Sequence, residues 1–118
     1  MATKDRVGRT GEELARGWLE RQGMEILDAN WRCAIGELDI VALDGDDLAF
    51  VEVKTRTSTA FGHPAESVTS EKLARLRRLA GAWLEAHDVH ASGMRIDVVA
   101  ILQRQGQPAL IEHMQGVG

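Results

Sequence analysis

The chain has 118 residues, of which 44% are hydrophobic and 27% are charged, and its net charge at pH 7 is −4. This length and balance predict one soluble globular domain over residues 1–118, with enough chain to form a core of its own. The acidic excess argues against a protein that coats nucleic acid nonspecifically, because such binding needs many Lys and Arg contacts to phosphate. It does not exclude nucleic acid as a partner, since local patches of charge matter more than the total.

Two further features bear on the compartment. No apolar run approaches the roughly 20 residues needed to cross a bilayer, and the first residues lack the apolar stretch of a secretory signal. Cys33 is the only cysteine, so no disulfide can form within the chain, and a packing role is expected for it. We therefore expect a cytoplasmic protein without a membrane segment.

The first predicted element is a helix over residues 11–22. Thr10 and Glu13 have the spacing of a capping box, apolar residues then recur on one face, and Gly23 ends the helix. Three further segments follow in the pattern of strands and turns, namely a strand at 24–29, a connection at 30–35 and a β-hairpin at 36–56.

The predicted hairpin carries charges that a plain core strand would lack. A two-residue or a four-residue turn around Gly45 gives the same register. That register places Asp39 opposite Glu52, with their Cβ atoms about 4.5–5.5 Å apart. It also places Glu37 opposite Lys54. Two facing carboxylates repel each other, and a divalent cation between them would remove the penalty.

Asp39, Glu52 and Lys54 form the pattern D-x12-E-x-K. Mg²⁺ is commonly held by one or two carboxylates, with water and phosphate oxygens completing its coordination, so Asp39 and Glu52 supply the minimum. Lys54 leaves the same strand face as Glu52 and could orient a water or offset charge on a phosphate. The alternative is an ordinary set of cross-strand ion pairs on an exposed face, in which Glu37 pairs with Lys54 and Glu52 with Arg56.

Helical phase separates the two glutamates at the start of the first helix. At about 100° per residue, Glu12 falls at the border of the apolar face, where it could reach the sheet, whereas Glu13 falls almost opposite that face. The alternative for both is that acidic residues are simply favoured near a helix N-terminus by the helix dipole.

The second half of the chain begins with an irregular segment at 57–70, where Gly62 and Pro64 act as breakers. His63 in this segment could contact a substrate, although a loop histidine is more often only exposed. Three regular elements are then predicted, namely a helix from 69 or 70 to 87, a strand at 94–102 and a strand at 109–114. The whole pattern predicts an α/β (α+β) fold with one mixed sheet flanked by two helices.

Several charged residues of this half are candidates for binding or for structure. Lys72 lies in the first turn of the second helix, an unfavourable place for a cation, which suggests a carboxylate or phosphate nearby. The alternative is that its stem covers apolar surface while the amine reaches solvent. Lys72, Arg75 and Arg56 are the candidate nucleic-acid contacts, and we expect Arg95 and Asp97 to form a structural salt bridge.

Five parts of the sequence together resemble the YraN-like family of uncharacterised bacterial proteins, namely GEELA at 11–15, NWRCAIGELDIVA at 30–42, FVEVKTR at 50–56, Lys72 and RIDVVAI at 95–101. That family resembles the PD-(D/E)xK restriction-endonuclease-like superfamily and, in mechanism, the archaeal Holliday-junction resolvases. By position, Glu12 matches the helical Glu of those enzymes and Asp39 their motif Asp. Glu52 and Lys54 match their E-x-K.

The resemblance implies a restriction-endonuclease-like core and a Mg²⁺- or Mn²⁺-dependent endonuclease, a hydrolase of phosphodiester bonds in DNA, including branched or damaged DNA. Asp39 and Glu52 would bind the metal, Glu12 would assist through water or a second metal, and Lys54 would position the nucleophile or stabilise the transition state. A homodimer would suit a unit of this size, since symmetric dimers are the commonest oligomers. The alternative function is a nucleic-acid-binding adaptor that keeps the fold without turnover.

Overall fold

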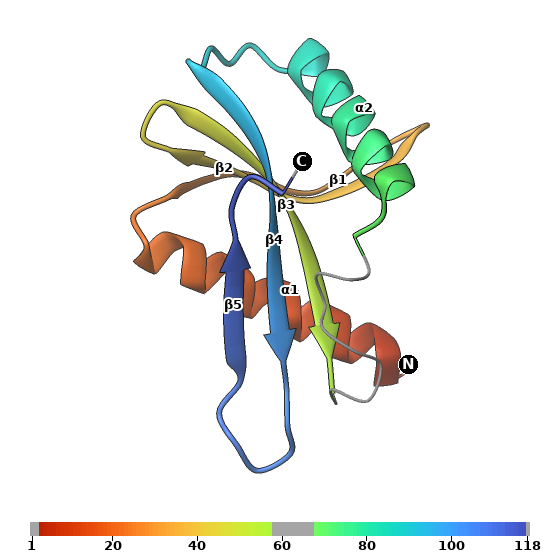
Figure 1. Ribbon diagram of the computed structural model, residues 1–118, viewed down its shortest axis with the longest axis vertical. Coiled ribbons are helices and arrows are strands. Elements are labelled where there is room, and N and C mark those ends of the chain that lie inside the picture. The colour runs from red at the N-terminus through yellow and green to blue at the C-terminus, as the bar shows by residue number, and fades with distance from the viewer. Residues whose placement is uncertain (1–2, 58–67, 118) are drawn as a thin grey trace.

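Two helices and five strands follow one another in the predicted order in the computed structural model, which describes residues 3–57 and 68–117, with the side chains of 3–9 left aside. In chain order they are α1 (Thr3–Arg21), β1 (Glu25–Cys33), β2 (Gly36–Asp44), β3 (Asp47–Arg56), α2 (Ser70–Ala86), β4 (Gly93–Leu102) and β5 (Leu110–Met114) (Figure 1). None of the helices in these residues is long and apolar enough to cross a membrane.

The five strands form one sheet in the order β1-β2-β3-β4-β5. All neighbouring strands are antiparallel except β3 and β4, which are parallel. A parallel pair needs a long crossover connection, and α2 lies in that connection. Figure 1 shows that α1 runs across the strands and that α2 lies apart from α1. The predicted α+β fold with a mixed sheet and two helices is therefore confirmed, and it is compatible with a restriction-endonuclease-like core.

Two predicted boundaries were wrong. The helix α1 begins at Thr3, so Thr10 lies inside it and does not cap it; the capping-box spacing also occurs within helices, where it has no capping role. The strand β1 continues through most of the predicted connection at 30–35. Within this stretch Asn30 has a positive φ of 56°, a conformation that asparagine tolerates better than most residues.

The predicted hairpin and its register are confirmed from the turn up to the pair Ile40–Val51. Gly45 and Asp46 form a two-residue turn between β2 and β3. Gly45 has a φ of +62°, a conformation that glycine adopts without steric penalty. Beyond Ile40–Val51 the two strands no longer pair, which matters for the site described below.

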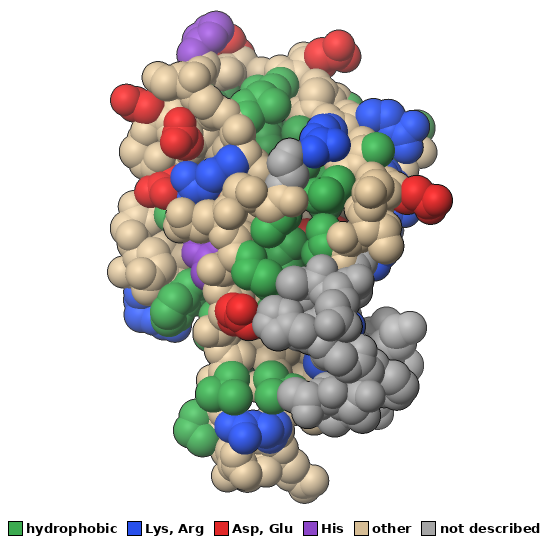
Figure 2. Space-filling model, viewed as in Figure 1, with side chains coloured by type: hydrophobic (Ala, Val, Ile, Leu, Met, Phe, Trp, Pro, Cys, Tyr) green, Lys and Arg blue, Asp and Glu red, His purple; other side chains and the backbone are tan. Residues whose placement is uncertain are grey.

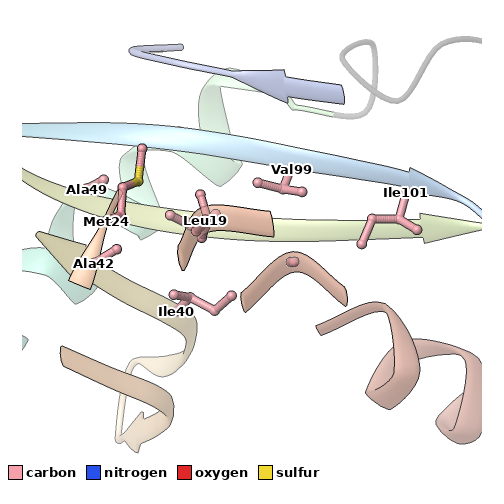
Figure 3. Packing of buried hydrophobic residues seen from close by; sticks show 9 residues of the cluster. Leu19, Met24, Ile40, Ala42, Ala49, Val99 and Ile101 are labelled. Atoms are coloured by element: carbon pink, nitrogen blue, oxygen red, sulfur yellow. The ribbon is translucent and has the colours of Figure 1, made fainter. Parts of the chain in front are cut away.

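Each face of the sheet carries its own apolar core. The core on the α1 face, shown in part in Figure 3, contains Ala15, Leu19, Met24, Ile40, Ala42, Ala49, Val51, Val99 and Ile101. The core on the α2 face contains Leu38, Val41, Leu48, Phe50, Leu76, Leu79, Ala80, Trp83 and Ile96. The helix α2 begins as predicted, with the Thr69 hydroxyl accepting a hydrogen bond from the Lys72 backbone N–H.

Asp97 is the one charged side chain that is fully buried among the described residues. Its carboxylate accepts hydrogen bonds from Arg95 Nε at 3.1 Å, His113 Nε2 at 2.8 Å and the Gly116 N–H at 3.0 Å. Arg95 also donates to Asp44 at 2.8 Å. The predicted Arg95–Asp97 salt bridge is confirmed, and it ties β4 to β5, to the C-terminal segment and to the end of β2.

Replacing this buried carboxylate tests its structural role. We expect Asp97→Ala to lower the free energy of unfolding by about 3–5 kcal/mol, because it leaves buried donors of Arg95 and His113 without an acceptor. Denaturant unfolding followed by circular dichroism measures the change. Asp46→Ala, in the exposed turn, is the control and should stay within about 0.5 kcal/mol of the wild type. Equal stability of the two variants would contradict the role of Asp97.

Candidate functional site

The candidate site lies where β2 separates from β3. After the pair Ile40–Val51, the Val53 N–H donates to Asp39 Oδ2 at 2.8 Å instead of to a strand carbonyl. Leu38 and Ile40 pack in opposite cores, although strand alternation would place them on the same face. The alternation therefore breaks at Asp39, and its carboxylate is turned into the gap between the strands and held there by β3.

Asp39 and Glu52 lie close enough in this gap for their side chains to interact. Burial, repulsion by Glu52 and a side-chain hydrogen bond with Glu52 raise the pKa of the Asp39 carboxyl to about 8, while the Val53 N–H opposes the rise. The predicted proximity of Asp39 and Glu52 is present, although they are not a pair of the strand ladder.

Two more glutamates approach the same carboxylate. Oxygen atoms of Glu12, Glu37 and Asp39 all lie within 4.8 Å of one another. With the amide nitrogen turned toward the carboxylates, Asn30 Nδ2 donates to Glu12 Oε2 at 2.7 Å and to Glu37 Oε1 at 3.1 Å. Burial raises the pKa of Glu12, repulsion by Glu37 adds to the rise, and the hydrogen bond from Asn30 opposes it. Glu12 thus reaches the sheet as helical phase predicted, whereas Glu13 is exposed.

Glu37 was predicted opposite Lys54, and that prediction is wrong. Beyond Ile40 the strand β2 pairs only with β1, so the register partner of Glu37 is Arg32. Arg32 Nε lies 3.3 Å from Glu37 Oε2, in an exposed ion pair. Glu37 was not among the predicted site residues, because the predicted ladder between β2 and β3 extended further than the real one. Its position two residues before Asp39 was the available signal, since such residues share a strand face.

Glycine at position 11 allows α1 to come close enough to bring Glu12 into the gap. A Cβ atom at Gly11 would overlap the hydroxyl of Thr55 on β3. Glycine inside a helix is less favourable than alanine by roughly 0.5–1 kcal/mol, so close packing against the sheet is the physical reason for it here. The next residue, Glu12, is then placed at the edge of the gap.

Two lysines lie near the carboxylate of Glu52. Lys54 shares a strand face with Glu52 and Phe50, and Phe50 packs in the core on the α2 face. Lys72, in the first turn of α2, lies close enough to Lys54 for the two side chains to interact. This contact, burial and repulsion by Lys54 lower the pKa of Lys72, while attraction by Glu52 opposes the change. A carboxylate therefore does lie near Lys72, as its position in the helix suggested.

The remaining predicted site residues are more peripheral. Arg75 is exposed on α2, close enough to Lys72 to repel it. Arg56 ends β3, two residues beyond Lys54 and on the same strand face. His63 lies outside the described residues, as does the rest of 58–67. Acidic and basic side chains are interspersed on the face shown in Figure 2, rather than gathered in one basic patch.

The donor set fits a hard divalent cation. Three carboxylates, from Glu12, Glu37 and Asp39, converge on a half-buried gap, and Glu52 interacts with Asp39. They offer only oxygen ligands, which suit Mg²⁺ and Mn²⁺. Their mutual repulsion, visible in the raised pKa of Asp39, is what a bound cation would relieve.

Comparison with known proteins places the chain in a family. The model of a family described as "Uncharacterised protein family UPF0102" matches residues 11–101. A UPF0102 protein of Beutenbergia cavernae is 58% identical over 118 residues, and one of Arthrobacter sp. (strain FB24) is 59% identical over 119 residues, each match covering 100% of both chains. A UPF0102 protein of Frankia alni is 50% identical over 116 residues, covering 98% of this chain and 97% of the relative. The resemblance to the YraN-like family is thereby confirmed: the chain belongs to the UPF0102 family.

Proposed function

We propose that this chain is a Mg²⁺- or Mn²⁺-dependent endonuclease, a hydrolase that cleaves phosphodiester bonds in DNA, including branched or damaged DNA. The observation that carries the proposal is the contact between the Asp39 and Glu52 carboxyls in a half-buried gap, with the Lys54 amine on the strand face of Glu52. Oxygen ligands beside an amine suit a reaction in which negative charge develops on a phosphate.

The residues would divide the work as follows. Asp39 and Glu52 would hold the cation, which would supply charge neutralisation at the phosphate. Glu12 accepts a hydrogen bond from the attacking water and helps to orient it. Lys54 donates to a non-bridging phosphate oxygen as charge builds there. Attack by water forms a new P–O bond and releases a proton to solvent, while the P–O bond to the leaving sugar oxygen breaks and that oxygen takes up a proton from solvent.

The basic residues around this site would hold the DNA backbone. Arg56, Lys72 and Arg75 extend from the end of β3 and the first turns of α2. A homodimer would double this contact surface, which a unit of this size needs to grip two strands. An adaptor without turnover would use the same basic residues but would not require Asp39 or Glu52.

Activity assays on site variants test the proposal. We expect the purified protein to cleave duplex, single-stranded or four-way-junction DNA with Mg²⁺ or Mn²⁺ and not with EDTA. Asp39→Asn and Lys54→Met should each lower kcat by about a hundredfold or more, because each removes an interaction with the reacting phosphate or its cation. Asp46→Asn, which changes an exposed carboxylate in the β2–β3 turn, is the matched control.

Two results would count against this proposal. One is that none of the three DNA forms is cut with either cation. The other favours the adaptor: Asp39→Asn leaves DNA affinity unchanged in the presence of metal, while Lys72→Ala and Arg75→Ala abolish it.

The raised pKa of Asp39 predicts how stability depends on pH in EDTA. Folding raises this pKa from 3.8 to about 8, so the stability that the protonated carboxyl contributes is present below pH 3.8 and lost as pH rises toward 8. Asp39→Asn cannot ionise, and its Tm should therefore rise relative to the wild type between pH 5 and pH 8.5. Added Mn²⁺ should raise the Tm of the wild type at pH 8.5 and leave Asp39→Asn unchanged. If the Tm difference between Asp39→Asn and the wild type is the same at pH 5 and pH 8.5, ionisation of Asp39 does not control stability in this range.

A further inference from the structure

A cavity of about 330 Å³ lies on the α2 face of the sheet, between α2, β4 and the C-terminal segment that follows β5 (Figure 1). The buried side chains of Phe50, Ala80 and Ile96 form its floor, and the exposed residues Met94 and Gly116 line its mouth. Ligand cavities span about 300–1,000 Å³, so this one is at the small end of the range. Its size and apolar floor suit one small ring system.

Arg95 also lines the cavity, but its charge is already compensated. Its Nε donates to Asp97 at 3.1 Å and its Nη2 donates to Asp44 at 2.8 Å. These hydrogen bonds use the edge of the planar guanidinium and fix its orientation. A guanidinium whose edge is occupied can still stack on an aromatic ring through its flat face. The cavity therefore favours a neutral, flat ring over an anion.

Met94 at the mouth supports the same class of ligand. Its side chain is 56% exposed, which is unusual for a large hydrophobic residue of a sheet with two apolar cores. A methionine side chain is flexible, and its sulfur makes favourable contacts with aromatic rings. A ring held in the cavity would cover this exposed surface.

The cavity adjoins the carboxylate site along β3. Phe50 precedes Glu52 by two residues on the same strand face, which separates their Cα atoms by about 7 Å. This separation is of the order of one nucleotide step. A base beside the phosphate at the site could therefore reach the cavity, provided that it is unpaired and outside the base stack.

We propose that the cavity binds one unpaired nucleobase of DNA, from a nucleotide next to the phosphate that is cleaved. The inference rests on the proposed function and names its substrate class, which is DNA with an extrahelical base, as in a bulge or at a branch point. Extruding a base from a paired duplex costs unstacking and unpairing energy, whereas a base that is already unpaired avoids most of this cost. The cavity would select such DNA for that reason.

NMR titration with adenosine tests the cavity without phosphate, metal or turnover. We expect adenosine, but not ribose, to shift the backbone amide signals of Met94 and Ile96. Ala80→Leu adds atoms to the floor of the cavity and should weaken adenosine binding by about tenfold or more, because stacking in the cavity is lost. Ala74→Leu makes the same change at an exposed position of α2 and is the matched control.

A change at the mouth guards against a folding defect in Ala80→Leu. Met94→Ser should weaken adenosine binding about fivefold or more and should melt close to the wild type, because the side chain is exposed. Leu110→Ser changes a residue of similar exposure, 51%, that does not line the cavity, and it is the control. Equal adenosine affinities of these two variants would overturn the base site.

Bulged DNA separates this inference from the proposed function. We expect kcat/KM for a duplex with a single-nucleotide bulge to exceed that for the fully paired duplex by about tenfold or more. Ala80→Leu should remove this preference and Ala74→Leu should keep it. If DNA is cut with no preference for the bulge, the inference is wrong and the function stands.

Binding measurements cover the case in which no DNA is cut. If the protein then still binds the bulged duplex about tenfold more tightly than the paired one, and Ala80→Leu removes the difference, the function is wrong and the base site stands. Adenosine binding without any preference for bulged DNA would assign the cavity to a free nucleoside or nucleotide and overturn the inference.

Discussion

Repulsion between the Asp39 and Glu52 carboxyls is the interaction around which the site is arranged. The pairing of β2 with β3 ends at Ile40–Val51, and the Val53 N–H then donates a hydrogen bond that holds the Asp39 carboxylate in the gap between the strands. The fold tolerates such crowding because a separate apolar core on each face fixes the strands independently of the site. Close packing of Gly11 on β3 also brings Glu12 of α1 to the site. The crowded carboxylates therefore come from three elements, α1, β2 and β3.

Two partly or fully buried aspartates in this protein have opposite surroundings. Asp97 receives hydrogen bonds from a guanidinium, an imidazole and a backbone N–H, so its charge is compensated within the fold. Asp39 has one backbone donor and acidic neighbours. A compensated buried carboxylate is typical of structural networks, whereas an uncompensated one is typical of sites that await a ligand. The contrast shows why burial alone would not have identified the site.

Turn chemistry and strand parity were enough to predict the hairpin register and the proximity of Asp39 and Glu52. They could not predict where the ladder ends, because that depends on Leu38 and Ile40 packing in opposite cores, a tertiary effect. Glu37 was misplaced for the same reason. Helical phase predicted that Glu12 reaches the sheet, since periodicity survives an error in the helix start. The approach of Lys72 to Glu52 depends on how α2 packs on the sheet, which periodicity within one element does not determine.

Asn30 holds two of the carboxylates of the site in place without adding a positive charge. Its amide bridges Glu12 and Glu37 from a backbone conformation that few residues other than glycine and asparagine accept. Because the amide is neutral, it holds the two carboxylates in place without cancelling their net negative charge. A lysine there would have formed permanent ion pairs, and an arriving cation would have to compete with it. For the proposed cation, the neutral bridge would make the folded chain a preorganised receptor, with the attracting carboxylates already in place before the cation arrives.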